Sequence, residues 1–588
     1  MESNIFKILT EEIRSYQDDF IDISDGVKYK QYDLIKNISR FENKVFLNGK
    51  LDSQLNYKYW YDIISPRVND EVKNIDFDRS NIFTSSDSFQ DKIAVYLSNL
   101  QLKDWLTETG QGEELNDAVE EFSAWGNVVW KKIKGGYERV DLKNFYVLNQ
   151  TAKTLNESSV IERHQLTQSD LREKEGVWKN VKEVIKTGGN KKLVPVENTE
   201  GIKTTNVYYD IYERNGEISE KSLFEAQDKK EEGSEEKFVL AKIIATGLNK
   251  SISKDSKYIL FAEPIDKMPY HEAHRGRYKG KWFREGMYEI LFDCQTRANQ
   301  LGNQIARGCE WASKVIFRTN DDTFVQNILT DLRNGDILKA RDLSQVDVRM
   351  QALDQLMVDW NRNLTVADKL ANSYEIVSGE TMPSNTPFKL GNLLNQNANK
   401  LFDFLREKLT IGFESLLNDW ILPKLLKDLK AKKIIDLTNS EENLKDYYQM
   451  VVNAWYIMNL INLPPHSPEI AQIIKAKKLE EITKNKKAII EAEKDFWNNA
   501  KLRIKVKITG ENVRLIADLE SLYSFIQLES DPIRRTSLIE MAMMKKNIDI
   551  SSLPKSTPEQ LMGGQRMPAT NMNNEMVSAM KTPQPMNR

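Results

Sequence analysis

A long run of periodic apolar residues starts near residue 283. From there to residue 314, apolar side chains recur every three or four positions, at Met287, Leu291, Cys294, Ala298, Leu301, Ile305 and Cys309. This spacing places them on one face of a helix. The same period recurs over residues 350–374 and 390–430, and shorter helical patterns occupy 441–547. The pattern predicts that the second half of the chain is helical.

The two helices predicted after residue 350 carry apolar stripes of their own. In the first of them the stripe is Leu353, Met357, Trp360, Leu364 and Leu370. In the second it is Leu394, Ala398, Leu401, Leu405, Leu409, Phe413, Leu416 and Trp420. We expect Pro423 to kink this second helix, because proline lacks an N–H and clashes with the preceding turn.

The first 282 residues mix the helical period with the alternation that is typical of strands. Helices are predicted within 1–60 and over 88–106, 113–125 and 167–175. Strands are predicted over 67–84, 127–134, 137–148, 160–163, 206–215, 238–245 and 258–262. A β-rich patch between helices is typical of an α+β fold, and the helical second half makes this fold predominantly helical.

The polar face of the predicted helix 283–314 is rich in uncharged amides. It carries Gln295, Arg297, Asn299, Gln300, Asn303, Gln304 and Arg307. Amides donate and accept hydrogen bonds, so such a face suits contacts between neighbouring helices in a ring of subunits. The other interpretation is a helix that faces a core on one side and water on the other.

Composition limits the classes of protein to which the chain can belong. Its 588 residues predict several domains. The near balance of 84 basic and 87 acidic residues argues against a dedicated tight binder of nucleic acid, and any DNA contact should be local or weak. Two cysteines, no signal-peptide pattern and no long apolar run predict a soluble protein made in a reducing cytoplasm. The Pro-, Met- and Asn-rich tail from Ser551 is predicted to be disordered.

Sequence signals for catalysis are weak. His271 and His274 would need a helical segment to bind a metal together, and they lack the HExxH spacing. Residues 276–282 (GRYKGKW) have three residues between the glycines, where a phosphate-binding loop has four, and a Trp in place of Ser or Thr. No Gly-x-Ser-x-Gly elbow occurs. We expect no enzyme, no catalytic or metal-binding residue and no cofactor.

A loop with two prolines separates the second and third long helices. The text from residue 374 to 402 reads YEIVSGETMPSNTPFKLGNLLNQNANKLF. Neither Pro383 nor Pro387 can lie inside a helix, and Ser384 or Asn385 could cap the helix that follows. The text resembles the tunnel loop of the portal proteins of tailed bacteriophages, in which GE-x-x-P-S-x-T-P-F-like text lies between two long helices.

The order of the other elements is also similar to this family. Residues 128–171, 206–219 and 269–306 resemble portal wing text. Residues 315–349 are predicted as a strand–helix–strand module in the place of the portal clip. The resemblance implies an N-terminal wing (1–282), a first stem helix (283–314), the clip, a second stem helix with wing continuation (350–376), the tunnel loop (377–390), a long wing helix (391–439), a helical crown (440–547) and a disordered tail (548–588).

The resemblance also implies which residues face DNA. The tunnel loop would contribute Ser378, Gly379, Glu380, Thr381, Met382, Pro383, Ser384, Asn385, Thr386, Pro387, Phe388 and Lys389, of which Lys389 is the basic residue. On the stem and its edge the candidates are Arg297, Arg307, Lys314 and Arg318.

The function implied by the resemblance is that of a portal, the head-to-tail connector at one vertex of the virion capsid. The chain would form a homo-oligomeric ring of about twelve copies, through which double-stranded DNA is packaged and ejected with weak, non-specific contact. The partners would be the terminase large subunit, the major capsid protein and scaffold, and the head-tail adaptor and tail proteins. No membrane is involved. The alternative is a cytoplasmic helical scaffold or adaptor without a DNA channel, and a phosphate-handling enzyme that uses residues 276–282 is a third possibility.

Overall fold

The computed structural model describes fourteen stretches of the chain, and all of them belong to the first of two compact units, Met1–Ile508. They are residues 4–52, 56–76, 81–86, 92–187, 208–229, 233–248, 257–312, 316–318, 344–346, 352–372, 388–428, 441–459, 468–484 and 502–506. The second unit, Thr509–Arg588, and with it the predicted tail, lies outside the described residues. Helices predominate and the strands form small sheets, so the predicted α+β class is confirmed.

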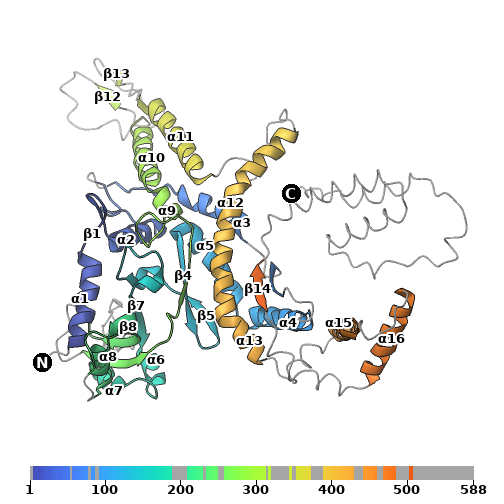
Figure 1. Cartoon of the computed structure of the whole chain (residues 1–588). Helices are drawn as coiled ribbons and strands as arrows, with labels where there is room; N and C mark the ends of the chain where they lie inside the picture. The colour runs from blue at the N-terminus through green and yellow to red at the C-terminus, as the bar shows by residue number, and fades with distance from the viewer. Residues whose placement is uncertain are drawn as a thin grey trace, which may run out of the picture. The chain divides into compact units, whose positions relative to one another are not determined.

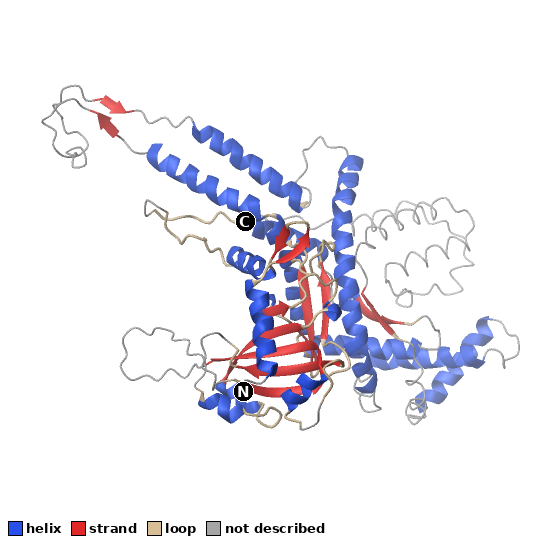
Figure 2. Cartoon of the chain, turned by 60° about the vertical axis from the view of Figure 1, so that its left-hand side comes forward, coloured by secondary structure: helices blue, strands red, loops and turns tan. Residues whose placement is uncertain are grey.

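Five antiparallel strands form the largest sheet (Figure 2). In spatial order they are β10 (Tyr258–Pro264), β9 (Phe238–Thr246), β8 (Tyr208–Ser219), β7 (Val160–Thr167) and β6 (Phe145–Val147). Alternate residues of a strand point to opposite faces, so Tyr212 packs with helices α1 (Asn4–Asp18) and α8 (Glu220–Gln227). Its neighbour Ile211 packs on the other face, with helices α6 (Gln168–Glu173) and α7 (Val181–Lys186).

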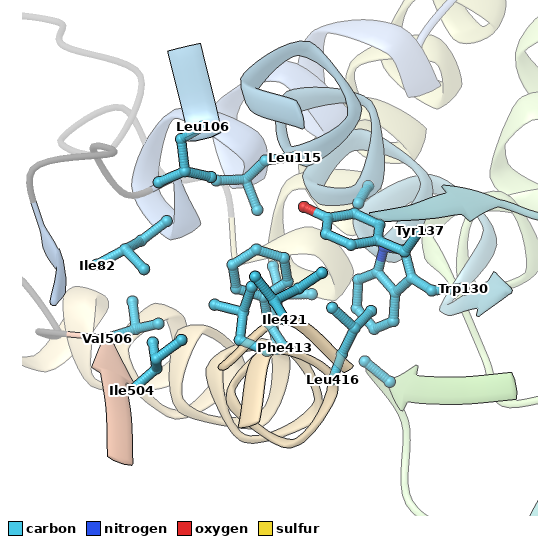
Figure 3. Packing of buried hydrophobic residues seen from close by; sticks show 14 of the residues in the cluster. Ile82, Leu106, Leu115, Trp130, Tyr137, Phe413, Leu416, Ile421, Ile504 and Val506 are labelled. Carbon is cyan, nitrogen blue, oxygen red and sulfur yellow. The ribbon is translucent and has the colours of Figure 1, made fainter. Parts of the chain in front are cut away.

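A second, three-stranded sheet packs between helices. Its order is β11 (Tyr270–His274), β4 (Asn127–Ile133) and β5 (Gly136–Arg139), with the short turns Leu142–Asn144 and Leu155–Glu157 farther along the chain. Helix α5 (Gln111–Trp125) leads into β4 through Gly126, whose φ of +80° favours glycine and ends the helix. Figure 3 shows the core that this sheet shares with later segments: Trp130 and Tyr137 lie close to Phe413 and Leu416.

Helix α12 (Phe388–Leu416) is the longest helix described, with 29 residues (Figure 1). Leu405, Leu409, Phe413 and Leu416 of the predicted stripe are buried. A π-helical turn (Leu417–Ile421) follows and leads into α13 (Leu422–Asp428), which contains Pro423. The interruption predicted from Pro423 therefore takes the form of a π turn just before the proline, where the ordinary hydrogen-bond ladder is already broken.

Helices α10 (Phe292–Ala312) and α11 (Ala352–Ala371) lie side by side (Figures 1 and 2). The predicted first helix thus begins at residue 292, because residues 287–290 form a separate turn, α9 (Met287–Ile290). The short strands β12 (Ile316–Arg318) and β13 (Ser344–Val346) pair antiparallel between the two helices. The helix predicted between these strands lies outside the described residues.

Two predictions for the N-terminal region were wrong. Residues 67–75 form most of helix α3 (Ile64–Ile75) rather than a strand, because Ile64, Val68 and Ile75 are buried on one helical face. Pro66 fits in the first turn of this helix, where its missing N–H has no helical partner to lose. A hairpin of β1 (Ile21–Ser24) and β2 (Val27–Tyr29) also separates α1 from α2 (Gln31–Glu42).

Distant parts of the chain meet near the C-terminal end of the described region. Strand β3 (Ile82–Ser85) pairs antiparallel with β14 (Arg503–Val506). Helix α4 (Lys92–Glu108) packs with α15 (Glu441–Asn459), which in turn contacts α16 (Pro468–Lys484). The predicted helical region 441–547 therefore contains α15, α16 and one strand, and its remainder lies outside the described residues. No helix among the described residues is long and apolar enough to cross a membrane.

Candidate channel and docking elements

The pair α10–α11 is joined by polar contacts as well as by apolar packing. The Asn363 side chain donates to the carbonyl of Cys294 at 2.9 Å. An exposed ion pair, Arg297 with Asp359, links the two helices at 3.5 Å. Ala298 of α10 and Ala367 of α11 are completely buried in the same apolar cluster. The two helices are thereby fixed side by side at their inner ends.

Three amides on α10 bind an extended segment of the same chain. The Asn303 side chain accepts from the N–H of Tyr59 at 2.8 Å and donates to its carbonyl at 2.9 Å. Asn299 accepts from the N–H of Tyr61 at 2.9 Å, and Gln295 donates to the Tyr61 carbonyl at 2.6 Å. Gln295 also accepts from the N–H of Ile63 at 2.9 Å. Side chains four residues apart on a helix therefore pair with alternate residues of an extended chain, as a neighbouring strand would.

This arrangement corrects the interpretation of the amide-rich face. We expected these amides either to reach a neighbouring subunit or to face water, but Gln295, Asn299 and Asn303 are at most 9% exposed and bind their own chain. A buried backbone group needs a partner, and residues 59–63 obtain theirs from these side chains. Gln300 and Gln304, on the adjoining strip of the helix, are exposed.

The stem candidates have different surroundings. Arg297 is half-exposed beside Asp359, and Arg307 is partly exposed and forms an ion pair with the buried Asp52. Arg318 lies in β12, opposite Ser344. Lys314 lies outside the described residues. Of the stem candidates, the two arginines on α10 therefore have described side chains, and both pair with acidic residues.

Most of the candidate tunnel loop, from Ser378 to Pro387, lies outside the described residues. Phe388 and Lys389 are the first two residues of α12, so the predicted loop boundary at residue 390 is too late. The helix starts directly after Pro387, which agrees with the exclusion of proline from helix interiors.

Two basic side chains hold α12 against the N-terminal part of the chain. Lys408 donates to the carbonyl of Arg275 at 2.9 Å, and Arg406 donates to the carbonyl of Asn74. The guanidinium of Arg275 in turn pairs with the fully buried Glu71 through two bonds of 2.6 and 2.8 Å. Burial lowers the pKa of both Arg406 and Lys408. These bonds join α12, α3 and the loop after β11 into one rigid group.

A buried charge cluster joins Lys131 of the three-stranded sheet to Glu162 and Glu213 of the five-stranded sheet, and it was not found from the sequence. Lys131 Nζ lies 2.6 Å from Glu162 and 2.8 Å from Glu213, and all three side chains are less than 10% exposed. Burial would lower the Lys131 pKa, but the two carboxylates raise it. Burial would raise the Glu213 pKa, but His164, Lys131 and Lys242 together hold it well below its usual range.

The two carboxylates of this cluster, together with His164, form a group in the described part of the chain whose side chains are of the types that bind metal ions. One ligand atom each of Glu162, His164 and Glu213 lies within 4.8 Å of the others. The ammonium of Lys131 already contacts both carboxylates, so a metal ion would have to displace it and leave a buried, unpaired charge. The cluster therefore favours a structural ion-pair network over a metal centre.

The two weak sequence signals for chemistry have structural explanations. His271 and His274 lie on strand β11 and not on a helix, beside Asp419 and Glu272 respectively, at 3.2 and 3.0 Å. Burial lowers the pKa of His271. Residues 276–282 follow β11 as an irregular loop, and Trp282 is fully buried and donates to Glu272 at 2.7 Å. The next helix begins at Met287, so no helix starts at Lys281 as it would at the lysine of a phosphate-binding loop.

Comparison with known proteins adds no relative: no family model and no curated protein matches the chain.

Proposed function

We propose that the chain is a portal subunit, which forms a ring at one vertex of a bacteriophage capsid. The observation that carries the proposal is the order of elements from α10 to α12. A 21-residue helix is followed by a two-stranded antiparallel pair, a 20-residue helix packed against the first, and then a 29-residue helix. This order corresponds to stem, clip, stem and long wing helix in the family that the sequence resembles.

In this proposal α10 and α11 form the stem, and the region of β12 and β13 is the clip that docks the terminase large subunit and later the head-tail adaptor and tail proteins. The tunnel loop enters the passage between α11 and α12. Because Lys408 and Arg406 fix α12 to the wing, the loop is attached to a rigid base. The ring would also contact the major capsid protein and scaffold, and its place is the portal vertex of the virion.

The charge balance fits a passage through which DNA slides during packaging and ejection. Every phosphate that a protein neutralises makes binding more sensitive to salt, by about 0.9 log units per log unit of salt. A subunit with 84 basic and 87 acidic residues avoids a deep electrostatic trap for DNA. A single lysine such as Lys389, repeated around a ring, still presents a circle of positive charge. The proposal includes no catalytic step.

Exposed apolar side chains favour self-association over the alternative of a monomeric helical adaptor. On α11, Met357, Val358, Val366 and Leu370 are exposed. On α12, Phe404 and Ile411 are exposed and lie seven residues apart on one side of the helix. Apolar residues repeated along two successive long helices require a partner surface more often than isolated ones do.

Light scattering after gel filtration tests the proposal, first on the full chain alone and then after co-expression with the capsid protein and scaffold. Twelve copies of the 68.1 kDa chain have a mass of about 817 kDa, and an assembly of that order in either sample supports the portal. A monomer or dimer in both samples would favour the adaptor without a channel.

A further inference from the structure

A segment beside α10, described over residues 43–52 and 56–60, exposes unusually many apolar side chains, and we call these residues the arm. Leu47 is 77% exposed, Tyr57 71%, Tyr59 61% and Val45 52%. A strip of chain with so much exposed apolar surface is characteristic of an interaction site.

The arm has a defined conformation in its described residues. At one end the N–H and carbonyl of Tyr59 are bound by Asn303 of α10. In the middle, the backbone N–H of Lys58 donates to the carbonyl of Lys50 at 2.9 Å. Trp60 packs against Phe41 and Phe46, with ring centroids 5.5 and 5.2 Å apart. The exposed side chains are therefore presented by a fixed backbone, which lowers the entropy cost of binding a partner.

A hollow of about 550 Å³ lies between the arm and α10. Its apolar lining includes Val45, Trp60 and Phe292, and basic side chains of Arg40, Lys58 and Arg307 lie around it. An apolar hollow with a basic rim fits an apolar surface that carries acidic groups.

The first half of α11 has this complementary chemistry. Met357 and Val358 are 47% and 59% exposed. Residues 352–361 contain two aspartates, Asp354 and Asp359, and no basic residue, whereas the arm contains three lysines and one aspartate. Opposite charges around two apolar patches select the register of a contact and speed the encounter.

The arm and Val358 lie on opposite sides of the α10–α11 pair. Asn299, Gln300 and Asn303 face the arm, about half a turn from Cys294 and Ala298, which pack toward α11. On α11, Val358 lies at least a third of a turn from Trp360 and Leu364, which pack against the shared core. A subunit with complementary patches on opposite sides forms head-to-tail contacts, and such contacts give a ring when the rotation between successive copies closes.

We propose that the arm of one copy packs against the first half of α11 of the next copy, so that this contact closes the ring. The occupant of the arm's apolar surface is thus a second copy of the chain. This inference rests on the proposed function, because it identifies the contact that holds the ring of that proposal together.

Crosslinking between two introduced cysteines tests the contact in the full chain. Leu47→Cys and Val358→Cys are combined with Cys309→Ser, which removes the exposed native thiol, while the buried Cys294 stays. Both introduced positions are exposed, so folding is unaffected. With a short bismaleimide, the double-cysteine variant should give a ladder of covalent oligomers up to the full ring. Each single-cysteine variant, and Leu47→Cys paired with Val177→Cys at another exposed site, should give none.

A charge exchange provides a second measurement. Lys58→Glu should lower the assembled fraction at least tenfold, and adding Asp354→Lys should restore it, since the pair is then reversed. Rings that assemble without any crosslinked ladder and ignore the charge exchange would overturn the contact and leave the portal proposal standing. A chain that forms no ring with or without capsid proteins would overturn both. A ladder that stops at dimers would overturn the head-to-tail contact.

Discussion

Asn303 binds both backbone polar groups of Tyr59, accepting from its N–H at 2.8 Å and donating to its carbonyl at 2.9 Å. The two residues are 244 positions apart in the chain. Through this pair, together with Asn299 and Gln295, helix α10 satisfies the hydrogen-bonding groups of an extended segment that has no neighbouring strand in the described part of the chain. Helix α10 and the end of the arm are therefore one structural unit.

Replacing Asn303 by Ala should release the end of the arm. The N–H and carbonyl of Tyr59 would lose their partners, at a cost of about 1–3 kcal/mol. Hydrogen exchange at the Tyr59 amide should then accelerate by about 5- to 150-fold. Gln304→Ala, at the next and exposed position, is the matched control and should leave this amide unchanged. Equal exchange rates in both variants would contradict the role of Asn303.

The buried cluster at Lys131 predicts a strong effect of a single substitution. Lys131→Met removes the cation that contacts Glu162 and Glu213 and leaves buried carboxylates without it, which should lower the free energy of unfolding by about 3–5 kcal/mol. Lys132→Met, at the exposed neighbouring position, should change it by less than about 0.5 kcal/mol. Chemical denaturation of both variants measures the difference. Similar midpoints and slopes for both would show that the cluster is not important for stability.

Glu121 predicts a pH dependence of stability. Burial raises its pKa to about 7, although Arg139 opposes the shift from 2.6 Å away. Because the folded-state pKa lies above the ordinary value of 4.5, the contribution of Glu121 is fully present below about pH 4.5 and is lost as the pH rises through about 7.

Glu121→Gln should therefore flatten the fall of the unfolding midpoint between about pH 5 and pH 8. The control is Glu120→Gln, which is exposed on the same helix and should follow the wild-type profile. Thermal unfolding across this range gives the comparison. A Glu121→Gln profile parallel to that of the wild type would contradict the raised pKa.

The proposed DNA passage makes a prediction for Lys389. Lys389→Glu replaces a ring of positive charge by a ring of negative charge and should reduce the amount of DNA packaged by at least tenfold, whereas Lys389→Arg keeps the charge and should package normally. The measurement is nuclease-protected DNA per capsid. Packaging by Lys389→Glu at the wild-type level would remove the tunnel-loop assignment.

Periodicity predicted the helices whose apolar stripe lies within one continuous stretch of the sequence. Met287, Leu291, Ala298 and Leu301 are fully buried, as the pattern indicates. The stripe fails toward its end, where Cys309 is exposed because α10 extends beyond the shared core. In α3 the spacing of Ile64, Val68 and Ile75 was already helical, and Pro66 obscured it. That signal was present in the sequence and was misinterpreted.

The tertiary contacts of the candidate site could not be predicted in this way. The partners of Asn303 and Gln295 lie more than 230 positions away, and the bond between Arg275 and Glu71 spans 204. An amide on a helix face has the same local signature whether it binds water, a neighbouring subunit or its own chain. Periodicity reports which face of an element is buried, and it carries no information on which distant segment covers a polar position.

Imaging of the purified assembly by negative-stain electron microscopy tests the central claim most directly. The full chain is examined alone and after co-expression with the capsid protein and scaffold. The portal account predicts a closed annulus with rotational symmetry and an axial hole wide enough for duplex DNA. Compact particles without a central passage in both samples would contradict it.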